Sequence, residues 1–374
     1  MTIQIQKCKL NLDSSQIEVL GPKNREISPK KLKSFIFNAF LPNNYPNSVS
    51  KDYLTYQIFD TLQALCSSLN GSLATYATLK TVGVGNSEAS ILSSTLSWLL
   101  RDGTGMISSI FFTYFKSSDL DYNPKQWRLV ADISNDIAMM IDLVAKNPYV
   151  LCFSAIFRAI CGVAGSATRM QIILHQTNGN DNLGDIAAKD GAQETLVNLV
   201  GLCLNLYLVP ILADRFYVLW AFFLVFVFLH ISFNYCGVRA VKSRILNQNR
   251  LNVILEQKIY DIKQVNDREP IFNFFNPFRK YKYPDFKIGQ GFTRSSSFKN
   301  KILHKIDDKI IITEGNLNIY QDAEITNEEI IFYLILMRTG YKIDKAEEIL
   351  VKIKEAGWVT DRIHFLVGNV RIKF

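Results

Sequence analysis

The stretch that decides the fold runs from Leu100 to Val144 and reads LRDGTGMISSIFFTYFKSSDLDYNPKQWRLVADISNDIAMMIDLV. Apolar residues at helical spacing are interrupted there by acids and arginines. An ordinary protein core or a plain membrane span does not hold ionised side chains at such positions unless they are paired or hydrated. The interruptions therefore predict a helical domain that keeps polar groups in its interior.

The second half of this stretch is predicted to be one helix opened by Pro124, because proline fits the first turn of a helix. Arg128, Asp132 and Asp136 follow at i, i+4 and i+8 and therefore share one face. Inside a bilayer each charge is costly unless paired, so the face would point inward. At a membrane surface the same stripe would be the solvated face of an amphipathic helix. The sequence leaves both interpretations open.

In the first half, apolar helices are expected at 88–100 and 106–115. They are separated by a polar break with the sequence Arg101-Asp102-Gly103-Thr104-Gly105. Glycine lets a backbone turn sharply or approach a ligand, so Gly103 and Gly105 favour a break. A tight loop with its charges in water is the alternative to a binding site here. A similar break near Asn70-Gly71 is expected to divide the apolar sequence from 52 to 81 into two helices.

A third set of residues lies in the helix that Pro148 is predicted to open. Its small side chains allow close helix packing and are Gly162, Gly165, Ser166 and Ala167. Arg158 lies deeper in this helix than Arg169, which can reach an interface by extending its side chain. Further along the chain, Asp185 and Lys189 stand at i, i+4, where a solvated salt bridge is the alternative to a functional role. The candidate polar site comprises Arg101, Asp102, Gly103, Gly105, Arg128, Asp132, Asp136, Arg158, Asp185 and Lys189.

The strongest membrane signals come later, at Thr195–Ala213 and Tyr217–Val238, because neither run contains an acidic residue, a lysine or an arginine. About 20 apolar residues span the core of a bilayer, so both runs are candidate spans joined by a short turn. Basic residues follow the second run and place that end on the cytosolic or matrix side. The alternative is a buried hydrophobic hairpin in a soluble core.

Composition narrows the classes of function. Apolar residues make up 48% of the 374 residues and charged residues only 20%, with a net charge of +8. No nucleic-acid-binding motif accompanies this charge, so a lipid membrane is the expected partner and nucleic acid is not. The six cysteines form no CxxC pair and the four histidines lack zinc-site spacing, so no metal is expected. The glycine turns do not form a nucleotide-binding fingerprint, and no other cofactor and no catalytic residues are predicted. The first residues resemble neither a secretory signal nor a clear transit peptide, and the organelle is left unspecified.

The last part of the chain is predicted to be a small α+β domain. Strands are expected at 309–313 and 317–320, then a helix capped by Thr326 and another that Asp344 begins. A hairpin is expected around Gly368-Asn369, from strands at 362–366 and 370–374. The predicted domains are an N-terminal soluble lead-in (1–45), a helical membrane domain (46–247), a juxtamembrane linker (248–307) and the α+β domain (308–374).

Several consecutive segments resemble the root UVB-sensitive (RUS) family over about residues 40–245. They are FLPNNYPNSVSKDYLTYQIFDTLQALCSSLNGSLAT (40–75), VGVGNSEAS (82–90), the opening stretch, ICGVAGSATR (160–169) and NLGDIAAKDGAQETLVNLVG (182–201). The resemblance implies a eukaryotic protein with membrane helices and without assigned catalytic residues. It also implies plant relatives linked to ultraviolet-B responses and vitamin B6 homeostasis.

These observations predict a mainly α protein: a polytopic helical membrane domain with a small C-terminal α+β domain. The leading hypothesis is a non-enzymatic membrane protein that binds or moves an unidentified small molecule through a polar-lined helical bundle. The alternative is a membrane scaffold that assembles with itself or with a relative, through small-residue helix faces and the C-terminal domain.

Overall fold

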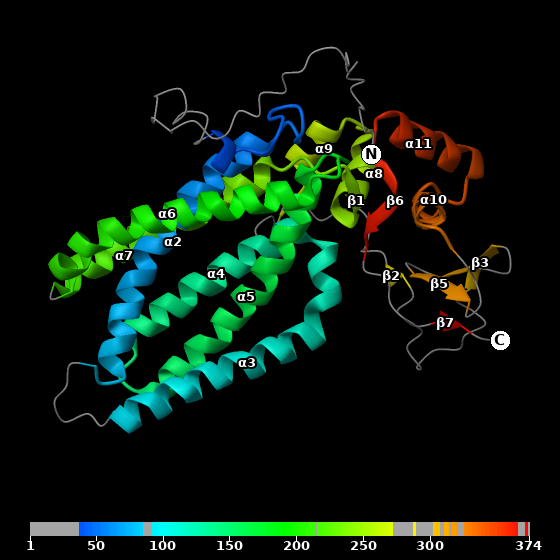
Figure 1. The fold of residues 1–374 in the computed structure, drawn as a ribbon. Coiled ribbons are helices and arrows are strands. Elements are labelled where there is room, and N and C mark those ends of the chain that lie inside the picture. Colours follow the sequence, from blue (N-terminus) through cyan, green and yellow to red (C-terminus); the bar gives the residue numbers. More distant parts are fainter. Residues whose placement is uncertain are drawn as a thin grey trace, which may run out of the picture.

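A computed structural model describes residues 37–84, 91–213, 215–271, 287–288, 302–306, 310–313, 316–320, 325–365 and 371–372. The protein is mainly helical, as predicted, and a small α+β domain lies at one side of a bundle of long helices (Figure 1). The bundle helices are α2 (Tyr53–Thr81), α3 (Ile91–Tyr122), α4 (Pro124–Val144), α5 (Pro148–Gln176), α6 (Leu183–Leu212) and α7 (Phe216–Ala240).

Prolines begin two of these helices, as predicted. Pro124 and Pro148 occupy the first turns of α4 and α5. A backbone N–H at that position has no acceptor within the helix, so proline, which lacks it, costs no hydrogen bond there. The side chain of Asn147 caps α5 by accepting a hydrogen bond from the Val150 amide at 3.1 Å. The start of each helix is therefore set by local chemistry.

The two predicted breaks are wrong, because α2 and α3 each run unbroken. Asn70 donates a hydrogen bond to the Phe223 carbonyl of α7 at 3.2 Å, so the polar side chain is used within the packing. A Cβ on Gly105 would lie 3.8 Å from Ala155 of α5, so the glycine sits in a close helix contact. A glycine costs a helix about 1 kcal/mol relative to alanine, and packing along a whole helix outweighs that.

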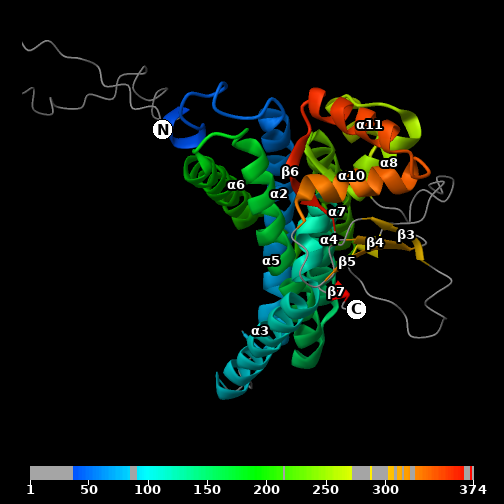
Figure 2. The ribbon, with the colours of Figure 1, turned by 90° about the vertical axis from the view of Figure 1, so that its right-hand side faces the viewer.

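The helices pack in a definite order. α2 contacts α4, α6 and α7, while α5 lies between α3 and α4 (Figure 1). α3 lies at the edge of the bundle in both views (Figures 1 and 2). Among the described residues, three helices are long and apolar enough to cross a membrane: α5, α6 and α7.

Within its described residues, the C-terminal region holds two small sheets and four helices. Its elements are β1 (Ile245–Asn247), α8 (Gln248–Gln257), α9 (Ile262–Arg268), β2 (Lys287–Ile288), β3 (Ile302–Ile306), β4 (Ile310–Thr313), β5 (Asn316–Tyr320), α10 (Asn327–Arg338), α11 (Ile343–Glu355), β6 (Val359–His364) and β7 (Arg371–Ile372). One sheet has the order β2-β5-β4-β3 with β7 also paired to β5, and the other joins β1 to β6 in parallel. Thr326 caps α10 through a capping box with Glu329, as the sequence predicted for the cap.

The predicted C-terminal hairpin is wrong. β6 pairs with β1, with Leu246 opposite Ile363, whereas β7 pairs with β5. The predicted turn at Gly368-Asn369 lies outside the described residues. β1, which follows α7, thus pairs with β6 in place of the strand predicted at 370–374.

The region predicted as a linker, 248–307, begins with folded structure. α8 and α9 contribute Leu251, Ile254 and Val265 to the hydrophobic core that α10 and Trp358 complete. Residues 272–286, with their mixture of aromatic and basic side chains, lie outside the described residues. The C-terminal domain is therefore built from the segment after α7 together with the later helices and strands.

Candidate functional site

A group of charged and polar side chains is buried where α2, α4 and α7 meet. We call it the central polar cluster, and it comprises Asp60, Arg128, Asp132, Asp136, His230 and Asn234. Asp132, Asp136 and His230 are buried, with between 1% and 9% of each residue exposed. The stripe on α4 therefore points inward, and its interpretation as a solvated face is wrong.

Ion pairs and hydrogen bonds connect the cluster across the three helices. Arg128 Nη2 lies 3.0 Å from Asp60 Oδ1 of α2, and Arg128 Nε lies 3.8 Å from Asp132 Oδ2. On the α7 side, His230 Nδ1 lies 2.9 Å from Asp136 Oδ2, and Asn234 donates a hydrogen bond to Asp132. Each acid of the α4 stripe thus has a partner on a neighbouring helix.

A second polar group adjoins this cluster between α2, α5 and α6. Arg169 contacts the carboxylates of Asp190 and Glu194, both at 2.5 Å. Gln57 of α2 donates to Asp190 at 3.1 Å. One arginine here is matched by two acids, as Arg128 is in the central polar cluster.

Arg101 and Arg158 lie apart from the α4 stripe, and both approach Asp142. Arg158 Nη2 lies 2.5 Å from Asp142 Oδ2, and Arg101 Nη2 lies 3.6 Å from the same oxygen. Asp142 follows Asp136 by six residues, which is about 9 Å along α4. The sequence candidates therefore form two separate groups within the bundle.

The remaining candidates have other surroundings. Asp102 is exposed on α3, and a Cβ added to Gly103 would meet none of the described residues within 4 Å. Asp185 accepts a hydrogen bond from the Asn43 amide at 2.7 Å, and Lys189 donates to the Asn38 carbonyl at 2.5 Å. Asp185 and Lys189 thus hold the segment before α2 against the start of α6.

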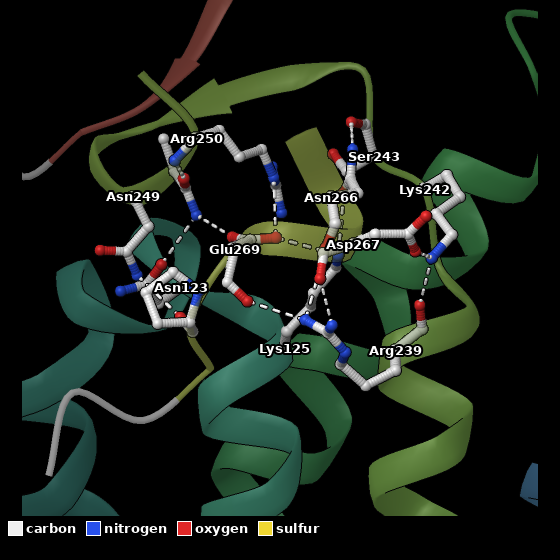
Figure 3. A network of polar contacts seen from close by, with 12 residues as sticks. Asn123, Lys125, Arg239, Lys242, Ser243, Asn249, Arg250, Asn266, Asp267 and Glu269 are labelled. Carbon is white, nitrogen blue, oxygen red and sulfur yellow. Dashed lines mark hydrogen bonds and ion pairs between the residues drawn. The ribbon is translucent and has the colours of Figure 1, made fainter. Parts of the chain in front are cut away.

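The junction between the bundle and the C-terminal domain carries a network centred on Glu269 (Figure 3). Its carboxylate accepts from Lys125 Nζ at 3.0 Å, from Arg250 Nε at 3.1 Å and from Asn247 Nδ2 at 2.7 Å. Burial alone would raise the pKa of the Glu269 carboxyl, but Arg250, Lys125 and the hydrogen bonds outweigh it and hold the pKa at about 2. This network joins the first turn of α4 to α8 and to the end of α9.

The sequence interpretation missed the partners that complete these groups. His230 and Asn234 stand at i, i+4 in an otherwise apolar helix, a pattern that marks one polar face and was available as a signal. Asp60 had no such signal, and neither did the acceptor Glu269, because their partners are far away in the sequence. Within the described part of the chain, no group of three His, Cys, Asp or Glu residues is placed to hold a metal ion.

Comparison with known proteins gives one consistent family. Residues 27–261 match the family described as "Vitamin B6 photo-protection and homoeostasis domain". The chain is 41% identical over 258 residues to RUS family member 1 of Dictyostelium discoideum, covering 67% of this chain and 49% of that protein. It is 30% identical to Protein root UVB sensitive 3 of Arabidopsis thaliana, covering 88% of this chain and 83% of that protein.

The matched region thus spans about half the length of the Dictyostelium relative. No solved structure matches the chain. The family match covers α2 to α8 and includes the central polar cluster and the group of Arg101, Arg158 and Asp142, but not Glu269. The chain therefore belongs to the root UVB-sensitive (RUS) family.

Proposed function

We propose that this chain is an integral membrane protein that binds or moves a small molecule at the central polar cluster, without catalysing a reaction. The observation that carries the proposal is the buried pair of His230 and Asp136, which lies between the apolar helix α7 and helix α4. Ionisable side chains inside a membrane domain are costly and are kept chiefly for transport, proton transfer or ligand binding.

The membrane assignment rests on the outer surfaces of the long helices. In the most apolar 18-residue stretch of α7, only 17% is buried within the chain. The corresponding figure for the most apolar stretch of α6 is 22%. The rest is apolar surface that water would hydrate poorly and that lipid would cover. Arg239 lies in the last turn of α7, and Lys242 and Arg244 follow the helix; these basic residues favour the cytosolic or matrix side for the C-terminal domain.

The family description indicates which small molecules to test first. It names vitamin B6, and the B6 vitamers carry a ring nitrogen and hydroxyl groups that exchange hydrogen bonds with carboxylates and imidazole. A vitamer bound beside His230 and Asp136 would replace part of their mutual pairing. Pyridoxine, pyridoxal and pyridoxamine are therefore the first ligands we would test.

The test replaces the α4 acid nearest the middle of the cluster. Asp132→Asn keeps the shape of the side chain and removes its charge, so it should abolish complementation of a null strain and vitamer uptake into proteoliposomes. Its abundance and membrane insertion should remain normal. Asp119→Asn, at an exposed i, i+3 pair with Lys116, is the matched control and should behave as the native protein. If Asp132→Asn lowers abundance while uptake per molecule is unchanged, the cluster is a structural ion-pair network.

The alternative of a membrane scaffold is favoured by one face of α5. A Cβ added to Gly165 would lie 3.8 Å from the Cβ of Ala131 of α4, whereas one added to Gly162 would meet no described residue within 4 Å. Gly162 and Ser166 are exposed and offer a face for close packing with a second copy or a relative. Gly162→Leu should dissociate such an assembly in cross-linking experiments, and unchanged cross-linking would remove this candidate.

A further inference from the structure

Two guanidinium groups share one carboxylate in the interior of the bundle. Asp142 is completely buried, with one oxygen accepting from Ser154 and the other facing Arg101 and Arg158. We call Arg101 and Arg158 the arginine pair. The distance of 3.6 Å from Arg101 to Asp142 is that of an ion pair without a hydrogen bond. Arg101 also lies over the ring of Trp98, at 5.2 Å from its centroid.

Around Asp142 there are two arginines for one carboxylate, whereas the groups around Arg128 and Arg169 have two carboxylates for one arginine. Asp102, next to Arg101 in the chain, is exposed on α3. The group formed by the arginine pair and Asp142 therefore holds one positive charge more than its own carboxylate can balance.

The arginine pair also has hydrogen-bond donors without acceptors. Among the described residues, Arg101 Nε and Arg158 Nε are both buried and lack a hydrogen-bond partner. A buried charged donor without a partner is strongly unfavourable, and such groups in native proteins usually face water or an ion. Glu269 also faces two cations, and Arg250 Nη2 there is likewise without a partner, but each cation has an acceptor besides Glu269: Asn266 for Lys125 and the Ile245 carbonyl for Arg250.

The side of α5 is the more open approach to the arginine pair. The side chain of Arg158 is 35% exposed, whereas that of Arg101 is 12% exposed. A groove of about 470 Å³ lies between the first turns of α3 and α5, and Ser93, Ser97, Leu100 and Tyr149 are among the residues that line it. Ser97 precedes Arg101 by one helical turn on the same face of α3, so the groove lies one turn away from Arg101, and neither arginine is among the residues that line it.

We propose that the arginine pair binds the phosphate group of a phosphate ester, with Asp142 as the internal counter-ion that the phosphate partly displaces. Guanidinium groups match phosphate oxygens with paired N–H donors, and the two unpaired Nε donors supply them. A phospholipid headgroup and a free phosphate monoester offer the same group. The site is distinct from the central polar cluster and does not depend on the function proposed there.

The experiment measures anion binding to the full chain. Purified protein in detergent is titrated with glycerol 3-phosphate, and glycerol serves as the uncharged control. Protein in nanodiscs of phosphatidylcholine is compared with nanodiscs that contain phosphatidic acid. Stabilisation by glycerol 3-phosphate identifies a free ester as sufficient, and stabilisation by phosphatidic acid alone identifies a lipid headgroup. If neither shifts the melting temperature of the native protein, the site does not exist.

Substitutions separate binding from a structural role. Arg101→Gln and Arg158→Gln should each weaken binding by about tenfold, because each removes charge-assisted hydrogen bonds. Asp142→Asn should strengthen binding, because it removes the competing counter-ion. Arg169→Gln, in the acid-rich group, is the control and should leave the affinity unchanged.

If the single arginine variants do not fold, a triple variant replaces them. Arg101→Gln, Asp142→Asn and Arg158→Gln together leave no buried charge unpaired, so this chain should fold and bind no phosphate. Equal affinity of the native and triple-variant proteins would overturn the proposal. So would a lower affinity of the Asp142→Asn protein, since that result fits a purely structural role for the carboxylate.

Discussion

At the scale of single residues, Glu269 joins parts of the chain that the sequence separates widely. Its carboxylate is 4% exposed and faces Lys125 of α4 and Arg250 of α8 (Figure 3). A buried carboxylate with two cations stabilises a structure only while all three charges are present, because removal of one leaves the others desolvated. Glu269 therefore contributes to the contact between the bundle and the C-terminal domain, together with Arg239, which donates to the Glu269 carbonyl, and Lys242, which pairs with Asp267.

Glu269→Gln should lower the free energy of unfolding of the C-terminal domain by about 3–5 kcal/mol, because two buried cations lose their counter-ion. Hydrogen exchange of the amides in α8 and α9 measures the effect. Glu348→Gln, in an exposed pair with Lys352, is the control and should leave exchange unchanged. Unchanged protection in the Glu269→Gln protein would show that the other contacts, among them those of Arg239 and Lys242, hold the junction without this carboxylate.

His364 makes the same region sensitive to acid. Burial, with the nearby charge of Arg250, lowers the pKa of this imidazole from 6.5 to about 4. The unfolded chain therefore takes up a proton between pH 6.5 and 4 that the folded chain does not, so stability falls as the pH falls through that window. His364→Leu should flatten the dependence of hydrogen exchange on pH between 6.5 and 4. An unchanged slope would assign the acid sensitivity to another group.

At the scale of the helix, close packing depends on a few small residues. A Cβ on Gly201 of α6 would lie 2.4 Å from Ser68 Oγ and 2.9 Å from Ser68 Cβ of α2. The glycine therefore permits the contact between these two helices. Asn205 strengthens the contact one turn later by donating to the Ser68 carbonyl at 3.1 Å.

Gly201→Ala should destabilise the bundle by about 1–3 kcal/mol, because the added methyl group forces the two helices apart. The melting temperature of the purified protein reports the loss. Ser68→Gly in the same chain should restore part of it by making room for the methyl group. Gly162→Ala, where a Cβ has open space, should be neutral. A neutral Gly201→Ala would mean that α2 and α6 adjust without cost.

Helix boundaries were predictable where a local signal sets them. Pro124, Pro148 and Thr326 begin helices for reasons that the neighbouring residues supply. The continuity of α3 through Gly103 and Gly105 was not predictable, because its contact with α5 decides it. The same holds for the charged groups: the α4 stripe is local, but the division between the central polar cluster and the arginine pair arises from tertiary packing.

At the scale of the whole molecule, apolar surface is distributed unevenly. The outward faces of α3, α6 and α7 carry exposed large side chains such as Phe111, Leu206 and Phe228. Most soluble monomers expose only small contiguous apolar patches. A protein with this surface needs lipid or an apolar partner to cover it.

Alkaline carbonate extraction tests that expectation directly. The full chain should stay in the membrane pellet, because long apolar helices inserted in lipid do not respond to pH or salt. A peripheral membrane protein of known behaviour serves as the control in the same extract. Release of the chain into the supernatant would contradict the membrane assignment and would favour a soluble assembly that covers these faces.

The pairing of β1 with β6 has a consequence for biosynthesis. β1 leaves the ribosome directly after α7, but β6 follows only when α10 and α11 have been made. Until then β1 has an unpaired edge, and Leu246 and Leu251 lack most of their final neighbours. Chains stalled between α9 and β6 should therefore recruit chaperones or aggregate through this segment, and a ribosome-bound series of lengths would locate the point at which protection begins.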